Sequence, residues 1–390
     1  MLNHIFKLIW KKRRSNFLLM LEIFISFIIL FGVASLTVYN LGNLAAPAGL
    51  SAERVWAVSC SFNTDSLPLV NAARETVKRE LLQIPDIERV SFMSNNMPYS
   101  FSSSNNDFKY EGRSVISEIM SVDTDFPEVL GLQLSEGRWF TNADTVAAKY
   151  RPVVITRKMK EDLLGNAEAV GALLNADNKD GGASRVIGVV DHFKHKSDFQ
   201  ERDYCVLAPF SGPWEQNFLV KTGLGATAET EARVARRLAQ LGPNWVVEIQ
   251  HLDEMKSRQN RIIWIPMLIL YIVCAFLVFN VALGLFGVLF QNIQRRRAEI
   301  GLRRAMGATE SKILRHFVGE TAMIATFGVA LGLFFTVQFP LMNVFDVAPE
   351  VYFKGMFWAV TFIYVLVLLC SVFPSKQAAA VQPATALHEE

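Results

Sequence analysis

The hydrophobic positions of this chain form four long runs, separated by polar stretches of very unequal length. A helix of about 20 apolar residues is long enough to cross a bilayer at 1.5 Å per residue. The runs cover residues 17–40, 262–290, 317–339 and 356–373. The pattern therefore predicts an α-helical membrane protein with four transmembrane helices. The first run exceeds the apolar core of about 7–15 residues found in a signal peptide, so we interpret it as a retained anchor.

The long polar stretch between the first two runs, residues 41–261, has the pattern of an α+β domain. The order strand, helix, strand occurs at both of its ends, over residues 54–60, 67–83 and 87–93 and over residues 217–221, 226–241 and 245–249. We expect these units to form one subdomain from residues 50–97 with 213–251. Residues 98–212 are β-rich and predict a second subdomain.

Lysine and arginine gather in the short segments that border the apolar runs. Residues 1–16 carry five and have the spacing of an amphipathic helix, the loop 291–316 carries seven, and the connector 340–355 carries one. Short loops rich in Lys and Arg remain in the cytoplasm. We therefore expect both termini, including the tail 374–390, in the cytoplasm and the domain 41–261 on the outer face.

Charge along the chain also separates the classes of function. Residues 41–261 hold 25 basic and 29 acidic residues, and the remainder holds 14 basic and 8 acidic residues. The basic residues flank apolar runs and do not cover a folded domain, which excludes a nucleic-acid binder. No GxxxxGK[ST] stretch and no nucleophile–base spacing occurs. We therefore expect no enzyme activity and no cofactor in this chain.

Four cysteines do not make a disulfide framework. Cys60 and Cys205 fall in the outer domain and could pair there, which the sequence leaves open. The one cluster with metal-ligand residue types lies in the segment DHFKHKSD and contains Asp191, His192, His195 and Asp198. The lysines between them argue against a bound cation, so we expect a solvated loop and no metal.

The stretch RRRAEIGLRRAMGA, residues 295–308, is the most informative part of the chain. Its spacing predicts a helix from Arg296 to Met306, ended by Gly307, with Thr309 capping the next helix. Further on, Gly328 and Gly332 form a small-xxx-small packing face in the third run. That face could meet another span of the same chain or a second subunit.

These motifs resemble the MacB/FtsX family of ABC transporter permeases. The resemblance rests on this basic stretch, on FPEVLGLQLSEGRWF with RPVVI and VIGVVDHF in the outer domain, and on FPSKQAAAVQPATAL in the tail. It implies a permease dimer in the cell inner membrane, seated on two cytoplasmic ATPase subunits, which bind ATP and Mg. The resemblance assigns contact with the ATPase to Glu299, Ile300, Gly301, Arg303, Arg304, Met306 and Gly307.

The resemblance further implies mechanotransmission, in which ATP-driven movement reaches a MacB-like periplasmic core domain. The expected outcome is export or extraction of a substrate. The alternative is an FtsX-like signalling or scaffold protein that regulates a cell-wall hydrolase. The second permease subunit could be identical or different, and a periplasmic adaptor or substrate protein and membrane lipid are expected partners.

Overall fold

The computed structural model describes residues 13–147, 149–176, 182–201, 204–210 and 212–379. It divides into a membrane unit, Met1–Gly42 with Ile265–Glu390, and an outer unit, Asn43–Trp264. Residues 1–12 of the predicted amphipathic helix and residues 380–390 of the predicted tail lie outside the described residues.

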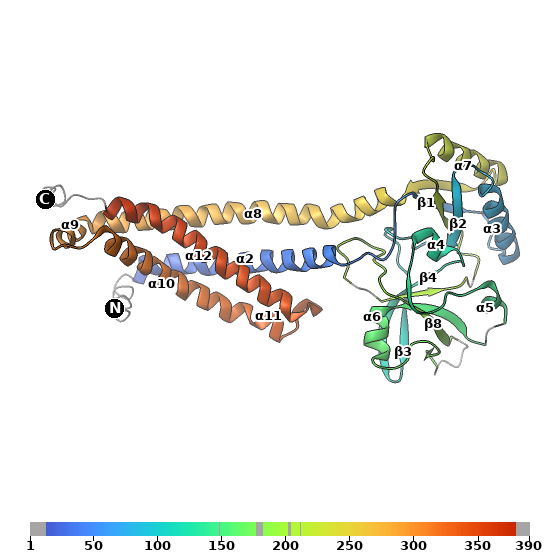
Figure 1. Ribbon diagram of the computed structural model, residues 1–390, viewed down its shortest axis with the longest axis horizontal. Helices are drawn as coiled ribbons and strands as arrows, with labels where there is room; N and C mark the ends of the chain where they lie inside the picture. Colours follow the sequence, from blue (N-terminus) through green and yellow to red (C-terminus); the bar gives the residue numbers. More distant parts are fainter. Residues whose placement is uncertain (1–12, 148, 177–181, 202–203, 211, 380–390) are drawn as a thin grey trace. The chain divides into compact units, whose positions relative to one another are not determined.

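Four helices in the described residues are long and apolar enough to cross a membrane, which confirms the predicted number of spans (Figure 1). They are α2 (Arg13–Ala45), α8 (Leu252–Arg295), α10 (Glu310–Thr336) and α12 (Pro349–Ala379). Helix α8 runs through 44 residues, with Pro266 inside it, so the polar segment before the second apolar run belongs to the same helix. Short elements join the others: α9 (Arg297–Ala305), α11 (Gln338–Leu341) and a 3-10 helix, η2 (Val344–Asp346).

Small residues let two of the spans approach closely. A Cβ atom on Gly332 would lie 2.3 Å from Cδ1 of Phe27, and one on Gly328 would lie 2.9 Å from Cγ2 of Ile23. Both glycines of α10 therefore pack against α2 of the same chain. Between the two alternatives that the sequence left open, the structure has the contact within one subunit.

The first sheet of the outer unit is built from strands at both ends of the insert. Its strands form one sheet in the order β11-β1-β10-β2, with antiparallel neighbours throughout. The elements in chain order are β1 (Val55–Ser61), α3 (Leu67–Leu81), β2 (Ile87–Met93), β10 (Asn217–Thr222), α7 (Ala228–Leu241) and β11 (Val246–His251). The two strands of each β-α-β unit are separated by a strand of the other unit. This is the split β-α-β arrangement.

The second subdomain is a mixed sheet with the strand order β3-β4-β9-β6-β8-β5, in which β7 also pairs with β8. Its strands are β3 (Asn105–Tyr110), β4 (Arg113–Ser121), β5 (Leu134–Gly137), β6 (Arg151–Thr156), β7 (Leu173–Leu174), β8 (Ser184–Val190) and β9 (Cys205–Ala208). Short helices connect them: α4 (Phe126–Leu130), α5 (Asn142–Ala147), and α6 (Arg157–Met159), which continues as a π-helix over Lys160–Leu164.

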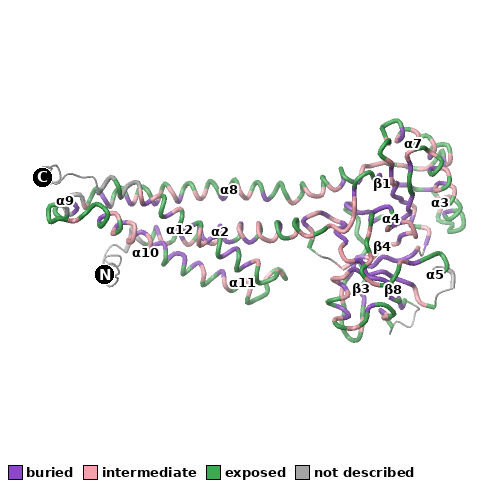
Figure 2. Tube along the Cα trace, in the orientation of Figure 1, coloured by how far each residue is buried: buried purple, intermediate pink, exposed green. Residues whose placement is uncertain are grey.

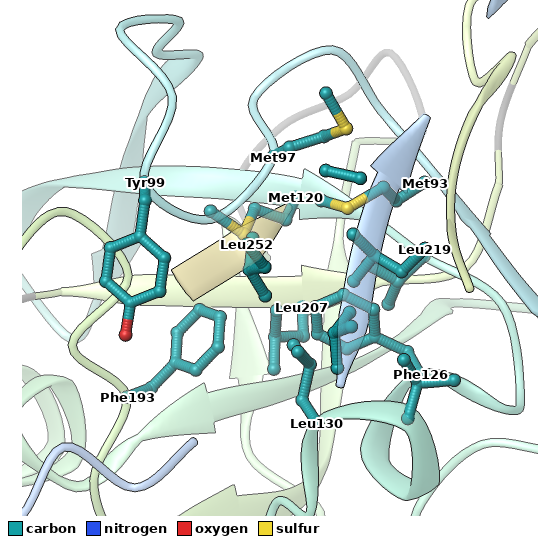
Figure 3. Close-up of a cluster of buried hydrophobic side chains, with 14 of the residues drawn as sticks. Met93, Met97, Tyr99, Met120, Phe126, Leu130, Phe193, Leu207, Leu219 and Leu252 are labelled. Atoms are coloured by element: carbon teal, nitrogen blue, oxygen red, sulfur yellow. The ribbon is translucent and has the colours of Figure 1, made fainter. Parts of the chain in front are cut away.

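Buried positions, purple in Figure 2, occur along strands of both sheets of the outer unit. One hydrophobic core joins these sheets to the first turn of α8 (Figure 3). Side chains alternate along β1, so that Ala57 faces this shared core and Val58 faces the core beneath α3 and α7. Leu252 of α8 is fully buried in the shared core. The two subdomains therefore share one core, and each also has a core of its own.

The cysteines are all free. Cys60 lies in the core beneath α3 and α7, and Cys205 lies in the shared core, so they do not form the disulfide that the sequence left open. Burial raises the pKa of the Cys60 thiol to about 12, which keeps it protonated at neutral pH.

The packing of α10 on α2 generates a prediction. Gly332→Leu should lower the thermal stability of the purified chain in mild detergent, because overpacking of a tight contact costs about 1–3 kcal/mol. Gly319→Leu is the matched control in the same helix, since a Cβ atom at Gly319 meets nothing within 4 Å. Size-exclusion chromatography after graded heating measures both. An equal loss in the two variants would contradict the assigned contact.

Candidate functional site

The basic stretch forms a helical hairpin tip between α8 and α10. The observed helix α9 agrees with the predicted one to within one residue at each end. Gly307 has φ +89°, and the Ala308 N–H donates to the Arg303 carbonyl at 3.0 Å. This pair of features is the Schellman C-cap, in which glycine supplies the left-handed residue. Thr309 stands at the N-cap of α10 as predicted, but its side chain makes no capping hydrogen bond.

A small apolar core holds the hairpin tip together. Ile300 packs with Ile293, Ile313 and Phe317, and only 2% of it is exposed. Gly301 is buried as well. The interpretation of Ile300 as an apolar anchor for a partner is therefore revised, because its side chain is already used inside the chain.

A forked ion pair ties the start of the tip to α10. Arg296 donates from Nη1 to Oε2 of Glu320 at 2.9 Å and from Nη2 to Oε1 at 3.2 Å. The side chains are 12% and 15% exposed. Two parallel bonds between planar groups fix direction as well as distance, so this pair restrains how α9 can tilt.

The outward surface of α9 carries apolar and cationic groups. Leu302 is 53% exposed and Met306 is 73% exposed, and Arg303 is also exposed. The side chains of Glu299 and Arg304 lie outside the described residues. Sequence reasoning missed Leu302, although its position two residues after a buried Ile300 on a helix places it on another face.

A second site lies in the outer unit, in the loop 191–200, which we call the clasp. Lys194 is 3% exposed, and its Nζ donates to the carbonyls of Asn43, Ala46 and Asp198. Asn43 belongs to the last turn of α2, where carbonyls lack the usual helical donor four residues later, and its carbonyl also accepts from the Ala46 N–H at 3.2 Å. A cation there completes the hydrogen bonding and also suits the negative end of the helix dipole.

The same clasp binds the beginning of α8. Asn260 Nδ2 donates to Oδ2 of Asp198 at 2.8 Å, and the Asp198 N–H donates back to Asn260 Oδ1 at 3.0 Å. Lys256 adds an ion pair to Asp198 at 2.8 Å. The clasp thus contacts both chain boundaries of the outer unit, the end of α2 and the beginning of α8.

A buried polar cluster supports the clasp from below. Glu118 Oε2 lies 2.8 Å from Nε2 of His195, and Glu118 Oε1 accepts from Lys196 at 3.1 Å and from Asn96 at 2.9 Å. His195 is fully buried. The loop that the sequence predicted to be solvated is therefore held by side-chain contacts, in which Asp191 pairs with Arg157, His195 with Glu118 and Asp198 with Lys256. Among the described residues, no group of three or more His, Cys, Asp or Glu residues could hold a metal ion.

The Glu118 cluster generates a pH prediction. Burial raises the pKa of Glu118, but the hydrogen bond and charge of His195, with Asn96 and Lys196, outweigh burial and keep the pKa below its usual value. A lowered pKa stabilises the fold fully above the unfolded pKa of about 4.3, and this stabilisation is lost as the pH falls below that value and through the lower pKa of the folded state.

Glu118→Gln should therefore lower the free energy of unfolding by about 2 kcal/mol near pH 6, and the difference from the wild type should shrink below about pH 4. Urea unfolding of the full chain in detergent, followed by tryptophan fluorescence, measures the difference. A gap of constant size down to about pH 3 would show that these partners do not hold Glu118 ionised.

Comparison with known proteins assigns the chain to a family. The family model of the MacB-like periplasmic core domain matches residues 17–238, more than half of the chain. The family model of the FtsX-like permease C-terminal region matches residues 269–383. The periplasmic region of MacB from Actinobacillus actinomycetemcomitans aligns with a TM-score of 0.39 at 17% identity, covering 56% of this chain and 97% of that one.

Two curated relatives show the extent of the likeness. The pyoverdine export ATP-binding/permease protein PvdT of Pseudomonas aeruginosa is 25% identical over 276 residues, which are 68% of this chain and 41% of that protein. The macrolide export ATP-binding/permease protein MacB of Pasteurella multocida is 23% identical over 295 residues, 72% of this chain and 44% of that protein. The chain spans less than half the length of these relatives. It belongs to the MacB/FtsX family of ABC transporter permeases, as a multi-pass inner-membrane protein with a MacB-like domain between its first and second spans.

Proposed function

We propose that the chain is the permease subunit of an ABC complex that exports or extracts a substrate. An ATPase on a separate subunit would supply the energy, and this chain would transmit its movement to the outer unit. The proposal is carried by the presence of two restrained sites in one chain. The first is the hairpin tip, and the second is the clasp at the points where the chain enters and leaves the outer unit.

The hairpin tip suits the docking of an ATPase. Its inner side is fixed by the Ile300 cluster and by the Arg296–Glu320 fork. Its outer side offers Leu302 and Met306 for apolar contact, and Arg303 for forked contacts with carboxylates. Because its inner side is fixed, α9 can move together with α8 and α10 when the ATPase displaces it, without first changing its own conformation. We retain Glu299, Gly301, Arg304 and Gly307 in the proposed contact region because they belong to the same short segment.

Topology follows from the charge distribution. We propose that the hairpin tip and both termini face the cytoplasm and that the outer unit lies on the opposite side, since the connector between α10 and α12 carries a single lysine. In this orientation the ATPase, with its ATP and Mg, meets α9. A second permease subunit, identical or different, and a periplasmic adaptor would complete the assembly.

The clasp is positioned to receive a movement of α8 and to pass it to the outer unit. A displacement of α8 would reach the clasp through Asp198, and the clasp holds the end of α2 through Lys194. The shared core then carries the same displacement to both sheets, because Leu252 of α8 is buried within it. Substrate would be handled by the outer unit and need not pass between the spans.

Charge reversal on the hairpin tip tests the docking. Arg303→Glu with Arg304→Glu should reduce the amount of co-purified ATPase about tenfold, the loss expected for about 1.4 kcal/mol of contact energy. Arg295→Glu is the matched control, since Arg295 is exposed and lies outside the proposed contact. Affinity purification in mild detergent measures retention and identifies the ATPase, any second permease and any adaptor. Unchanged retention in the double variant would refute the docking site. A co-purifying hydrolase, together with an ATPase rate that candidate substrates do not change, would favour signalling over transport.

Removal of the Lys194 ammonium group tests whether the clasp transmits movement to the outer unit. Lys194→Met should leave the ATPase bound but remove the nucleotide-dependent change in hydrogen–deuterium exchange within residues 43–264. Loss of charged hydrogen bonds to the α2 carbonyls should also cost about 2 kcal/mol of stability. Lys109→Met is the control, because Lys109 is a 66%-exposed lysine of the same unit. Persistence of the full exchange change in Lys194→Met would remove the clasp from the proposed route.

A further inference from the structure

The outer unit contains a polar cavity of about 420 Å³ beside α3, which we call the α3 cavity. This volume falls within the range of about 300–1,000 Å³ typical of sites for small organic ligands. Asn71, Glu75 and Lys78 line one wall, because their spacing places them on the same face of α3. The opposite wall comes from the loops that follow β4 and β9, two parallel strands whose carboxyl ends lie side by side. Ligands often bind at such strand ends.

The deepest cation of the α3 cavity is already neutralised within the chain. Arg74 donates from Nη2 to Oε2 of Glu215 at 3.2 Å, and these side chains are 6% and 3% exposed. Its Nε donates to the Glu215 carbonyl at 2.8 Å, and its guanidinium lies over the Phe210 ring, 4.4 Å from the centroid. The charge of Arg74 therefore does not decide which ligand the cavity attracts.

The second cation of the cavity, Lys78, is surrounded by carboxylates. It forms an ion pair with Asp125 and lies 3.6 Å from Oδ2 of Asp123. Burial lowers the pKa of the Lys78 ammonium, but the charges of Asp123, Asp125 and Glu75 outweigh burial and raise that pKa above its usual value. Three carboxylates thus act on one ammonium, which leaves this side of the cavity with a surplus of negative charge.

Asp123 is the buried member of these carboxylates. It lines the cavity, and its side chain is 13% exposed. Its Oδ1 accepts from the Ser91 hydroxyl at 2.5 Å, and its Oδ2 accepts from the Phe92 N–H at 2.9 Å. Burial nevertheless raises the pKa of Asp123, because Lys78 and these donors compensate only part of the lost hydration. A second cation near Asp123 would stabilise its ionised form.

The mouth and the floor of the cavity differ in character. Glu75 lies at the exposed mouth, and among the described residues its carboxylate makes no hydrogen bond and no ion pair. The rings of Phe92 and Phe140, which also line the cavity, are only 2% and 1% exposed. Aromatic rings attract aliphatic carbon and, through their faces, cations. An anionic wall therefore adjoins an aromatic floor.

From these observations we infer that the α3 cavity binds a primary ammonium group on a short aliphatic body. The ammonium would face Glu75 and Asp123, and the aliphatic carbons would lie against the phenylalanine rings. The volume is too small for a folded partner, so the group belongs to a free amine or to the lysine side chain of a peptide. Binding takes place in the outer unit and requires no ATPase, so this inference stands or fails separately from the proposed function.

Three probes of nearly equal size test the sign of the charge: n-butylammonium, n-butanol and n-butyrate. Saturation-transfer difference NMR with the full chain in deuterated detergent at pH 7 measures the dissociation constant of each. Butylammonium should bind about fivefold more tightly than butanol, because a partly exposed ion pair adds a modest attraction. Butyrate should bind most weakly. Equal binding of butylammonium and butyrate, or tighter binding of butyrate, would overturn the inference.

Two substitutions of Glu75 locate the binding. Glu75→Gln should weaken butylammonium about threefold and leave butanol unchanged, since it removes one exposed charge and keeps the side-chain size. Glu75→Lys should abolish the preference for butylammonium over butyrate. Glu229→Gln is the matched control, because Glu229 is an exposed carboxylate on α7 of the same unit and does not line the cavity. Unchanged butylammonium binding in Glu75→Gln, or an equal loss in Glu229→Gln, would count against the site.

A peptide distinguishes the two sources of the ammonium. Acetyl-Gly-Lys-Gly-amide presents the same group on a peptide backbone. Tighter binding of this peptide than of butylammonium assigns the cavity to the lysine side chain of a protein, and weaker binding assigns it to a free amine. Either result supports the inference if Glu75→Gln weakens the tighter of the two ligands, and contradicts it if Glu75→Gln weakens neither.

Discussion

The antiparallel pairing of β1 with strands from the far end of the insert is the constraint on which the outer unit depends. β1 lies between β10 and β11, about 160 and 190 residues later in the chain, so the first sheet exists only when both ends of the insert meet. One face of that sheet then contributes to the shared core, which also contains side chains of the second sheet and of α8. A displacement applied at one boundary of the unit therefore acts on a single packed body.

The same constraint explains why the clasp is where it is. Because β11 is followed directly by α8, and α2 precedes β1 by a short segment, the two chain boundaries come near each other at one end of the first sheet. Lys194 and Asp198 use that proximity, the former through carbonyls of α2 and the latter through Asn260 and Lys256. Lys194 thus satisfies backbone carbonyls at the end of α2, whereas Asp198 is held by side chains in the first turns of α8.

Periodicity was sufficient to predict the spans, the paired β-α-β units and the hairpin tip, because each is a local pattern. Strand β2 was predicted with its observed bounds, and helix α9 to within one residue at each end. The role of Ile300 was not predictable in this way, since an apolar residue on a nine-residue helix can face its own chain or a partner. The clasp was misread as a solvated loop because its contacts come from residues between four and about 150 positions away. The mixed strand order of the second sheet has no local signal either.

The interleaving of the first sheet has a consequence for biosynthesis. As the chain leaves the ribosome, β1 and β2 emerge more than a hundred residues before β10, the strand that must lie between them. Until then their edges are unpaired, and such edges can pair with other chains. The α3 helix can cover one face of these strands during that interval, but not their open edges. The first sheet is complete only after residues up to 251 have been translated. A chain that pauses or is truncated before that point therefore exposes unpaired strand edges and is prone to aggregate.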